Sequence, residues 1–341
     1  MSVGAGADTV WLVADVGGTN ARFALVGGPD GAPERVESLP TRDHAGLAEA
    51  AAAYLDRYAP DVRPAAACLA VAGPVTGGTY HLTNAGWPKG TAEGVREHLG
   101  VPHLEILNDF EALALALPRL GPDDLVPIGP AADRADPAAD PAAGPAPLAV
   151  LGPGTGLGVA GLVPTPAGWV PLPGEGGQVD VPAATDRELA VARLLRAEHG
   201  TARAESLLSG TGLARIHRYL AILDGVKVEP LDPARICAHD GDPLCAEAVA
   251  MFCALLGSLA GNVALTLGAR GGVHLGGGIL PRIADELRRS DFRARFEAKP
   301  PVEDYLRPVP TSLIVHPGPA LVGAAERLAR TPAATETLEH V

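Results

Sequence analysis

The chain has 341 residues, more than a single hydrophobic core usually serves, so we expect two domains with a ligand-binding cleft between them. Apolar residues make up 47% of the sequence but aromatic residues only 4%, a globular composition whose core must consist largely of Ala, Leu and Val. The formal net charge of -13 comes from scattered carboxylates, which argues against non-specific binding to nucleic acid or to an anionic membrane.

The first predicted element is a pair of apolar strands joined by a polar turn, VWLVADVGGTNARFALVGG, at residues 10–28. In the Rossmann and Walker patterns a glycine loop opens a helix, whereas here another strand follows. Phosphate would then be held by free backbone N–H groups of the turn. The alternative is an ordinary β-hairpin, because Gly-Gly and Thr-Asn are common turn residues.

The residue types in this turn favour a phosphate site that includes a metal ion. Gly17 and Gly18 permit positive φ and leave no side chain in the way of a ligand, and we expect Thr19 to donate from its hydroxyl. A pure anion site would exclude Asp15, but this carboxylate is suitable if Mg²⁺ accompanies the phosphates. The residues predicted to contact the nucleotide here are Asp15, Gly17, Gly18, Thr19 and Asn20.

Strand and helix patterns then alternate, which predicts an α/β fold. We expect helices at residues 44–58 and 90–100, and strands at residues 65–75 and 103–108. The last of these strands ends at Asn108 and Asp109, and polar residues at the carboxyl end of a strand are typical of α/β active sites. The alternative for this pair is the N-cap of the helix that follows.

Residues 121–147 are rich in Pro and Ala without an apolar period, so we expect a surface excursion or disordered loop there. Beyond it, LAVLGPGTGLGVAGLV at residues 148–163 repeats the strand, glycine turn and strand of the opening. This repetition predicts two halves of similar design. One nucleotide held between them would need two clamps, the second formed by Gly154, Thr155 and Gly156, which includes no acid.

A run of 22 uncharged residues, 248–269, is long enough to span a bilayer. We favour a buried helix, because polar and small residues dilute its hydrophobicity and no aromatic or basic flank anchors it. The four cysteines show no metal-binding spacing and are expected to be reduced core residues. The N-terminal residues lack the pattern of a secretory signal, so we expect a cytoplasmic protein.

Six motifs resemble, in order and spacing, the bacterial glucokinase family: ADVGGTNARFAL, LNDFEALA, GPGTGLGV, PGEGGQVD, LLSGTGL and LGGGILPR. The resemblance covers nearly the entire chain. It implies the fold of the sugar-kinase and actin-like ATPase superfamily, with two α/β domains of ribonuclease-H-like core and an active site in the interdomain cleft. The expected small domain comprises residues 1–118 and 318–331, because the final helix returns to it, and the large domain comprises residues 119–317.

The activity implied by this resemblance is ATP-dependent phosphorylation of glucose at the 6-hydroxyl, giving glucose 6-phosphate and ADP. ATP and Mg²⁺ are the expected cofactors, and Asp109 is the candidate base for the hydroxyl proton. Carboxylates and amides suit an uncharged hexose. The predicted sugar-binding residues are Asn84, Asn108, Asp109, Glu175, Gln178 and Glu205. The glycine turns predicted to lie against the ATP base contain Ser209, Gly210, Gly276, Gly277 and Gly278.

One position departs from the family as the resemblance describes it, since Gln178 stands where His is usual. The resemblance therefore supports kinase chemistry more strongly than it supports glucose as the substrate. A kinase for mannose, fructose or an N-acetylhexosamine, or one that uses polyphosphate, stays open. A sugar-responsive DNA-binding regulator is disfavoured, because only nine residues precede the first strand, and an actin-like assembly protein has no use for the sugar motifs. Related enzymes are commonly homodimers, which we also expect here.

Overall fold

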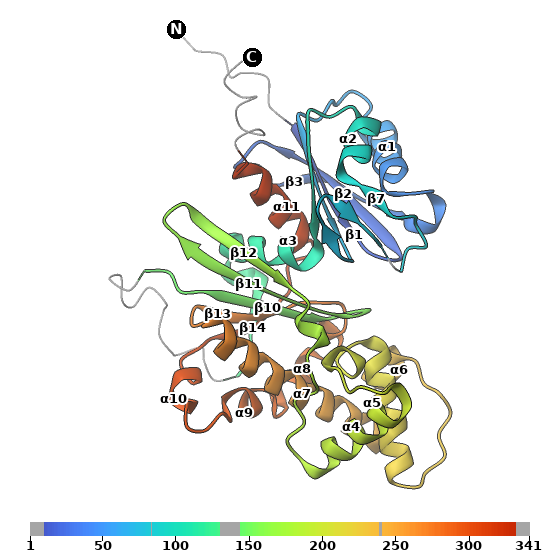
Figure 1. The fold of residues 1–341 in the computed structure, drawn as a ribbon, viewed down its shortest axis with the longest axis vertical. Helices are drawn as coiled ribbons and strands as arrows, with labels where there is room; N and C mark the ends of the chain where they lie inside the picture. Colours follow the sequence, from blue (N-terminus) through green and yellow to red (C-terminus); the bar gives the residue numbers. More distant parts are fainter. Residues whose placement is uncertain (1–9, 83, 130–143, 239–240, 332–341) are drawn as a thin grey trace. The chain divides into compact units, whose positions relative to one another are not determined.

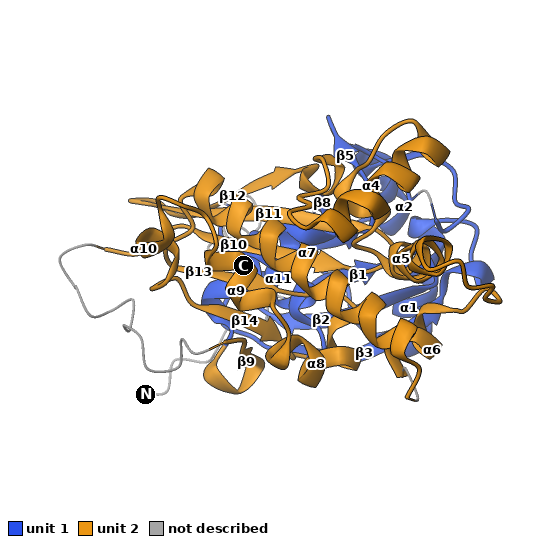
Figure 2. Ribbon diagram, turned by 90° about the horizontal axis from the view of Figure 1, so that it is seen from below, with its two compact units in different colours: residues 1–120, 317–341 blue, residues 121–316 orange. Residues whose placement is uncertain are grey.

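The computed structural model describes residues 10–82, 84–129, 144–238 and 241–331. The chain divides into two compact units, coloured separately in Figure 2. Unit 1 contains residues 1–120 and 317–341, and unit 2 contains residues 121–316. The expected domain bounds, 118 and 318, differ from these by one or two residues.

Unit 1 is built on a five-stranded sheet in the order β3-β2-β1-β4-β8 (Figure 1). β1 pairs antiparallel with β2 and parallel with β4, and β4 pairs parallel with β8. All six residues of β4, AACLAV, are buried, as expected of a central strand covered on both faces. The strands of this sheet are β1 Val10–Val16, β2 Asn20–Gly27, β3 Pro33–Pro40, β4 Ala66–Val71 and β8 His103–Asn108.

Helices cover both faces of this sheet. Leu12, Ala14 and Val16 alternate along β1 toward the core that the helices α1 and α2 complete. α3 and α11 pack together on the other face, against β1 and β4. The helices are α1 Leu47–Tyr58, α2 Ala92–Leu99, α3 Asp109–Ala116 and α11 Pro319–Ala329. The smaller elements are β5 Val75–Thr76, β6 Thr79–Tyr80, β7 Gly90–Thr91, η1 Thr41–Asp43 and η2 Leu117–Arg119.

Unit 2 repeats this plan in a six-stranded sheet, β12-β11-β10-β13-β14-β9. β10 pairs antiparallel with β11 and parallel with β13, and β13 pairs parallel with β14, as β1 does with β2 and β4, and β4 with β8. The prediction of two halves of similar design is therefore confirmed. The strands are β9 Leu125–Pro127, β10 Leu148–Pro153, β11 Leu157–Thr165, β12 Gly168–Gly174, β13 Gly272–Leu275 and β14 Thr311–Ile314.

The segment expected to be irregular, residues 121–147, has regular structure at its start, which corrects that expectation. Pro122–Asp124 form the 3-10 helix η3, and β9 pairs antiparallel with β14 at the sheet edge. Ile128 is buried in the core of unit 2, with Val126 packed against it. The pairing partner lies far along the chain, so the local composition did not indicate this strand. Residues 130–143 lie outside the described part of the chain.

The uncharged run belongs to α7, Pro243–Leu267, which is long and apolar enough to span a membrane by length and composition alone. Of its most hydrophobic window, 78% is buried inside unit 2, which agrees with the prediction of a core helix. A side chain at Gly257 would collide with the carbonyl oxygen of Phe292, so this glycine allows α9 to approach closely. All four cysteines lie in the described part of the chain, where they are buried and form no disulfide, as expected.

The other helices of unit 2 lie around α7. Several begin at side-chain caps: Ser209 caps α5, Asp242 caps α7, and Thr185 with Glu188 forms a capping box for α4. These helices are α4 Asp186–His199, α5 Gly210–Leu223, α6 Pro233–Ala238, α8 Ala284–Arg289, α9 Phe292–Glu297 and α10 Glu303–Leu306. The remaining 3-10 helices are η6 Gly176–Gln178, η7 Ala204–Ser206 and η8 Leu280–Ile283.

Candidate functional site

Two acidic residues of unit 1 lie at the same edge of its sheet. Asp15 is the penultimate residue of β1, and Asp109 directly follows β8. Both strands pair in parallel with β4, so their carboxyl ends meet at one edge. Burial raises the pKa of Asp15, an effect that Arg22 opposes from the adjacent strand. Burial and the charge of Asp15 together raise the pKa of Asp109 from 3.8 to about 7.

The turn after Asp15 is anchored from two sides. The N–H of Gly17 donates to the carbonyl of Asn20 at 2.9 Å. Thr41 holds the middle of the turn, because its hydroxyl donates to the Gly18 carbonyl at 2.8 Å and its N–H to the Thr19 carbonyl at 2.9 Å. The N–H of Gly17 is thus occupied, while no described residue accepts from the N–H groups of Gly18 and Thr19. Thr19 and Asn20 are exposed.

Glycine permits positive φ at residues 17 and 18, but neither residue is among the described glycines in that region of backbone space. At Gly18 glycine is required by packing instead. A Cβ there would lie 2.7 Å from the Cβ of Asn84 and 3.0 Å from its carbonyl oxygen. The structure therefore brings Asn84, a predicted sugar ligand with an exposed side chain, against the predicted phosphate turn.

Asn108 is the N-cap of α3, the alternative that the sequence left open. Its Oδ1 accepts from the N–H of Phe110 at 2.9 Å, and its Nδ2 donates to the Gly73 carbonyl at 3.1 Å. Each group keeps one further hydrogen-bonding position, so capping does not remove Asn108 from a sugar site. Asp109 lies in the first turn of α3 and also accepts from the Phe110 N–H, at 3.1 Å.

The second glycine turn joins β10 to β11 in unit 2. The N–H of Gly154 donates to the Gly156 carbonyl at 2.8 Å, and the Gly154 carbonyl accepts from the N–H of Gly210 at 2.9 Å. The turn is thereby tied to the first residue of α5, and Thr155 is exposed at its tip. A Cβ at Gly154 would meet no atom within 4 Å, so this backbone is open to a ligand.

The remaining residues predicted for the ATP base lie at nearby turns of unit 2. Ser209 is buried and its hydroxyl accepts from the Gly212 N–H at 3.1 Å, so its side chain supports the start of α5. The buried Gly276 donates its N–H to the Leu151 carbonyl of β10 at 2.8 Å. Gly277, with φ of 88°, packs on the Pro153 carbonyl, and both Gly277 and Gly278 are exposed.

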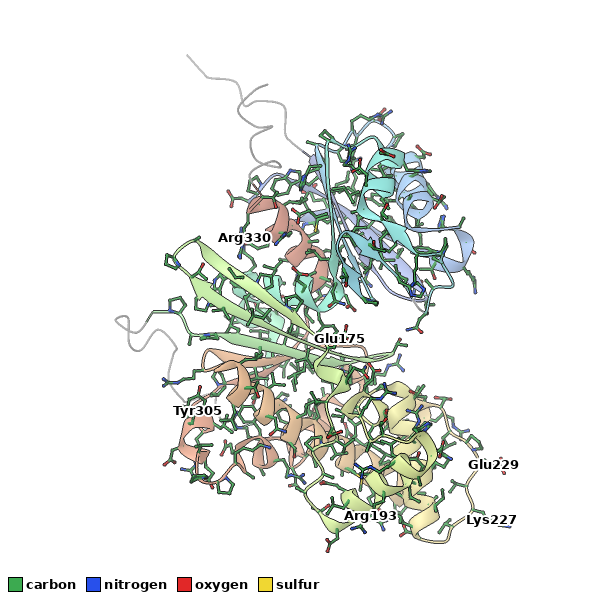
Figure 3. All side chains as sticks on the ribbon, in the orientation of Figure 1. Glu175, Arg193, Lys227, Glu229, Tyr305 and Arg330 are labelled. Carbon is green, nitrogen blue, oxygen red and sulfur yellow. The ribbon has the colours of Figure 1, made fainter. Side chains whose placement is uncertain are left out.

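The three sugar ligands predicted in unit 2 follow β12 and α4. Figure 3 shows Glu175 at the turn after β12, where its carbonyl accepts from the Gln178 N–H at 3.0 Å. The Nε2 of Gln178 donates to Glu205 Oε1 at 3.0 Å. The other oxygen of Glu205 accepts from the Leu157 N–H at 3.0 Å, and a Cβ at Gly156 would lie 2.6 Å from it. Predicted sugar ligands and the predicted phosphate turn are therefore in direct contact.

Sequence reasoning missed Arg203, whose Nη1 donates to Gln178 Oε1 at 2.9 Å. The available signal was its place two residues before Glu205, a predicted sugar ligand that lies in the 3-10 helix η7. The charged residues around Ala204 are also typical of a solvent-exposed surface, so the sequence alone did not single out Arg203. The contact with Gln178 depends on folding of a segment 25 residues away.

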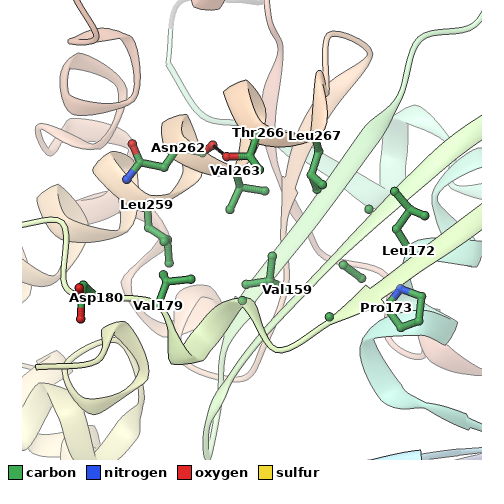
Figure 4. A pocket seen from close by; sticks show the side chains of 14 residues that line it. Val159, Leu172, Pro173, Val179, Asp180, Leu259, Asn262, Val263, Thr266 and Leu267 are labelled. Carbon is green, nitrogen blue, oxygen red and sulfur yellow. Dashed lines mark hydrogen bonds between the residues drawn. The ribbon is translucent and has the colours of Figure 1, made fainter. Parts of the chain in front are cut away.

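A cavity of about 380 Å³ lies in unit 2 between α7 and the strands β11 and β12 (Figure 4). It shares Gly174, Gly176 and Val179 with the segment that contains Glu175 and Gln178, but neither of these two side chains lines it. Most of its lining is apolar, including Val159 and Leu259. Such a lining does not suit a hexose, so this cavity is distinct from the predicted sugar site.

Solved structures share this architecture. A glucokinase from an Antarctic psychrotroph matches with a TM-score of 0.82 at 37% identity, over 95% of this chain and 99% of that chain. A Streptomyces griseus ROK family glucokinase in complex with glucose and AMPPNP matches with a TM-score of 0.62 at 20% identity, over 93% of this chain and 98% of that one, a level that shows the fold alone. The repeated sheets and these neighbours define a mixed α/β protein of the actin-like ATPase class, to which the sugar kinases belong.

The sequence further identifies one family within that class. The family model described as Glucokinase matches residues 12–331. A curated glucokinase of Chromobacterium violaceum is 45% identical over 321 residues, 93% of this chain and 89% of the relative. A glucokinase of Paramagnetospirillum magneticum is 45% identical over 318 residues, 92% of this chain and 96% of the relative. The chain belongs to the glucokinase family, as the motifs in its sequence predicted.

Proposed function

We propose that this protein transfers the γ-phosphoryl group of ATP to the 6-hydroxyl of glucose, releasing glucose 6-phosphate and ADP. Membership of the glucokinase family, whose model matches residues 12–331, supports this activity. The structural observation that carries the chemistry is the pair of carboxylates at one sheet edge, Asp109 with a pKa of about 7 beside Asp15. The Asp109 carboxylate suits proton transfer, and the Asp15 carboxylate suits binding of a cation.

Asp109 is proposed as the general base. A base is most effective when its pKa lies near the operating pH, and burial beside a second acid places this carboxyl there. It would accept the proton of the 6-hydroxyl as the oxygen attacks phosphorus, while the bond from phosphorus to the bridging oxygen of ADP breaks. Asn108, which bonds to the Gly73 carbonyl and the Phe110 N–H, would orient a neighbouring hydroxyl.

The residues at the first turn fit Mg²⁺. Asp15 is a hard oxygen donor whose carboxylate form is disfavoured by burial, which a nearby cation would offset. Mg²⁺ usually binds one or two carboxylates, waters and substrate phosphates, so one acid is sufficient. The ion would neutralise charge on the transferring phosphoryl group. The exposed Thr19 hydroxyl and the N–H groups of Gly18 and Thr19 would bind phosphate oxygens.

We assign the remaining contacts to unit 2. The turn of Gly154, Thr155 and Gly156 would bind phosphate, and the turns at residues 209–212 and 276–278 would lie against the base. Glu175, Gln178 and Glu205 would bind glucose hydroxyls, joined by Asn84 and Asn108 of unit 1. Because the base belongs to one unit and these carboxylates to the other, we propose that substrates complete the site between both units, as the sequence predicted.

The proposal includes a cytoplasmic homodimer in carbohydrate breakdown that binds neither nucleic acid nor membrane. The net charge of -13 and the burial of α7 support the last two points. The family resemblance supports the dimer.

A coupled assay for ADP release tests the activity, with glucose, mannose, fructose, glucosamine and N-acetylglucosamine as acceptors and ATP or polyphosphate as donor. We expect glucose with ATP and Mg²⁺ to give the highest kcat/KM. Because Gln178 replaces the usual His, a related hexose remains the second candidate substrate. A higher kcat/KM for mannose or an N-acetylhexosamine would assign the enzyme to that sugar, and activity only with polyphosphate would exclude ATP as donor.

A further inference from the structure

The side chain of Gln178 is held at both ends. Its Oε1 accepts from Arg203 Nη1 at 2.9 Å, and its Nε2 donates to Glu205 Oε1 at 3.0 Å. Glu205 is itself fixed, because its second oxygen accepts from the Leu157 N–H at 3.0 Å. Three side chains and one backbone amide thus form a continuous chain of hydrogen bonds within unit 2.

This chain allows only one orientation of the Gln178 amide. Turning the amide by 180° would place its NH₂ group against the guanidinium of Arg203, donor facing donor, and its oxygen against the carboxylate of Glu205, acceptor facing acceptor. In the observed orientation, Nε2 keeps one N–H and Oε1 keeps one acceptor position for a ligand. A neutral imidazole at this position would offer a ligand a different set of hydrogen-bonding groups. The pair of Gln178 and Arg203 therefore presents the sugar with contacts that His would not.

The backbone also brings Arg203 to this position. Residues 179–181 and 202–204 run side by side: the N–H of Ala204 donates to the Val179 carbonyl at 2.7 Å, and the N–H of Val181 to the Ala202 carbonyl at 2.9 Å. Asp180 and Arg203 are paired in an antiparallel bridge. Among the described residues, Gln178 is the one group that the Arg203 guanidinium hydrogen-bonds, so truncating this side chain removes no other such contact.

We propose that Arg203 is a positioning residue for the sugar, which acts by fixing the amide of Gln178. This inference rests on the proposed function, because it takes Gln178 and Glu205 as ligands of the hexose. Without Arg203 the amide would keep only its bond to Glu205 and would sample other rotamers. Sugar affinity and discrimination between epimers then fall, while proton transfer by Asp109 in the other unit is unaffected.

The test is a double-mutant cycle on the full-length enzyme with wild type, Arg203→Ala, Gln178→Ala and the double variant. We expect Arg203→Ala to raise the KM for glucose about fivefold to tenfold, the size expected when one ordinary hydrogen bond that orients a ligand group is lost. The kcat should change less than about twofold, and the KM for ATP should not change. Because Arg203 acts through Gln178, its removal should have no further effect once Gln178 is Ala. Arg203→Lys should recover part of the affinity, since an ammonium can also donate to Oε1.

Arg215→Ala is the matched control, since Arg215 Nη1 donates at 2.8 Å to the carbonyl of Ser206 in the same segment without touching Gln178. We expect its glucose KM to match that of wild type. If Arg203→Ala and Arg215→Ala raise the glucose KM equally, both arginines stabilise this segment in general, and the proposal is overturned. An effect of Arg203→Ala that persists in the Gln178→Ala background would also overturn it, as would an unchanged glucose KM.

Calorimetric titration of each variant with glucose, without nucleotide, separates this inference from the proposed function. Wild type that binds glucose but releases no ADP would contradict the kinase activity alone, and the cycle would then be read from Kd. Wild type that turns over glucose while Arg203→Ala has the same KM and Kd would contradict the role of Arg203 alone.

Discussion

Asp15 and Asp109 lie at the carboxyl ends of the two strands that flank β4, and the charge of Asp15 adds to burial in raising the pKa of Asp109 to about 7. Two buried acids at one sheet edge, each with a raised pKa, are costly for the fold. Such groups cluster at functional sites, which agrees with different roles for the two carboxylates.

We expect Asp109→Asn to lower kcat for glucose phosphorylation by about 100-fold or more, because an amide cannot accept the hydroxyl proton. The Asn oxygen can still accept from the Phe110 N–H, so α3 should begin as before. Steady-state rates with saturating ATP and glucose measure the effect, with glucose Kd by calorimetry as the control. Turnover within about tenfold of wild type, roughly 1.4 kcal/mol of barrier, would remove Asp109 from the role of base.

The same substitution should change how stability depends on pH. Because the folded state binds this proton more strongly than the unfolded state, the contribution of Asp109 to stability falls as pH rises from about 4 to about 7. Asp109→Asn abolishes that fall, so its Tm relative to wild type should increase across this window and level off above it. Thermal unfolding without Mg²⁺ or nucleotide measures this, with Asp56→Asn on the exposed side of α1 as a control for the lost charge. A constant difference between pH 4 and pH 8 would contradict the shifted pKa.

Gly156→Ala should weaken glucose binding. The new Cβ would lie 2.6 Å from Glu205 Oε2, and the carboxylate would have to leave the Leu157 N–H. A mobile side chain yields cheaply, so we expect a rise of about tenfold in glucose KM with little loss of Tm. Gly174→Ala, where a Cβ meets no atom within 4 Å, is the control. Similar glucose KM values for the two variants would show that Glu205 tolerates the displacement.

Gly18→Ala should destabilise unit 1, while Gly17→Ala should not. At Gly18 the added methyl overlaps the Cβ and backbone of Asn84, whereas at Gly17 the nearest atom is 3.7 Å away, an ordinary contact. We expect a loss of about 1 kcal/mol or more for Gly18→Ala in urea unfolding, and an increased KM for ATP. Equal stability of the two variants would mean that Asn84 moves aside without cost.

Gln178→His should retain kinase activity with an altered KM for the sugar. Imidazole can donate and accept, but its reach differs from that of the amide. A neutral imidazole bonded to Arg203 and Glu205 keeps no position for a ligand, whereas the amide keeps two. Kinetics with glucose, mannose and glucosamine measure the change. If discrimination among the three sugars is the same as in wild type, position 178 does not select the substrate.

Much of the architecture was predictable because it depends on local pattern. The apolar run before Asp15, the glycine turn and the apolar run after it specify a hairpin, and the same pattern near Gly154 specifies another. The carboxyl end of an apolar strand at Asn108 indicated a candidate position for a site. These features depend on neighbours only a few residues apart, where periodicity and turn chemistry act.

The tertiary structure decided what each residue contacts. β9 is a strand because β14, nearly two hundred residues later, offers an edge to pair with. Gly18 is glycine because Asn84 packs on it, and Arg203 meets Gln178 because two distant segments run side by side. Contacts between residues far apart in the chain form only after the core brings the segments together, and no pattern within one segment contains that information.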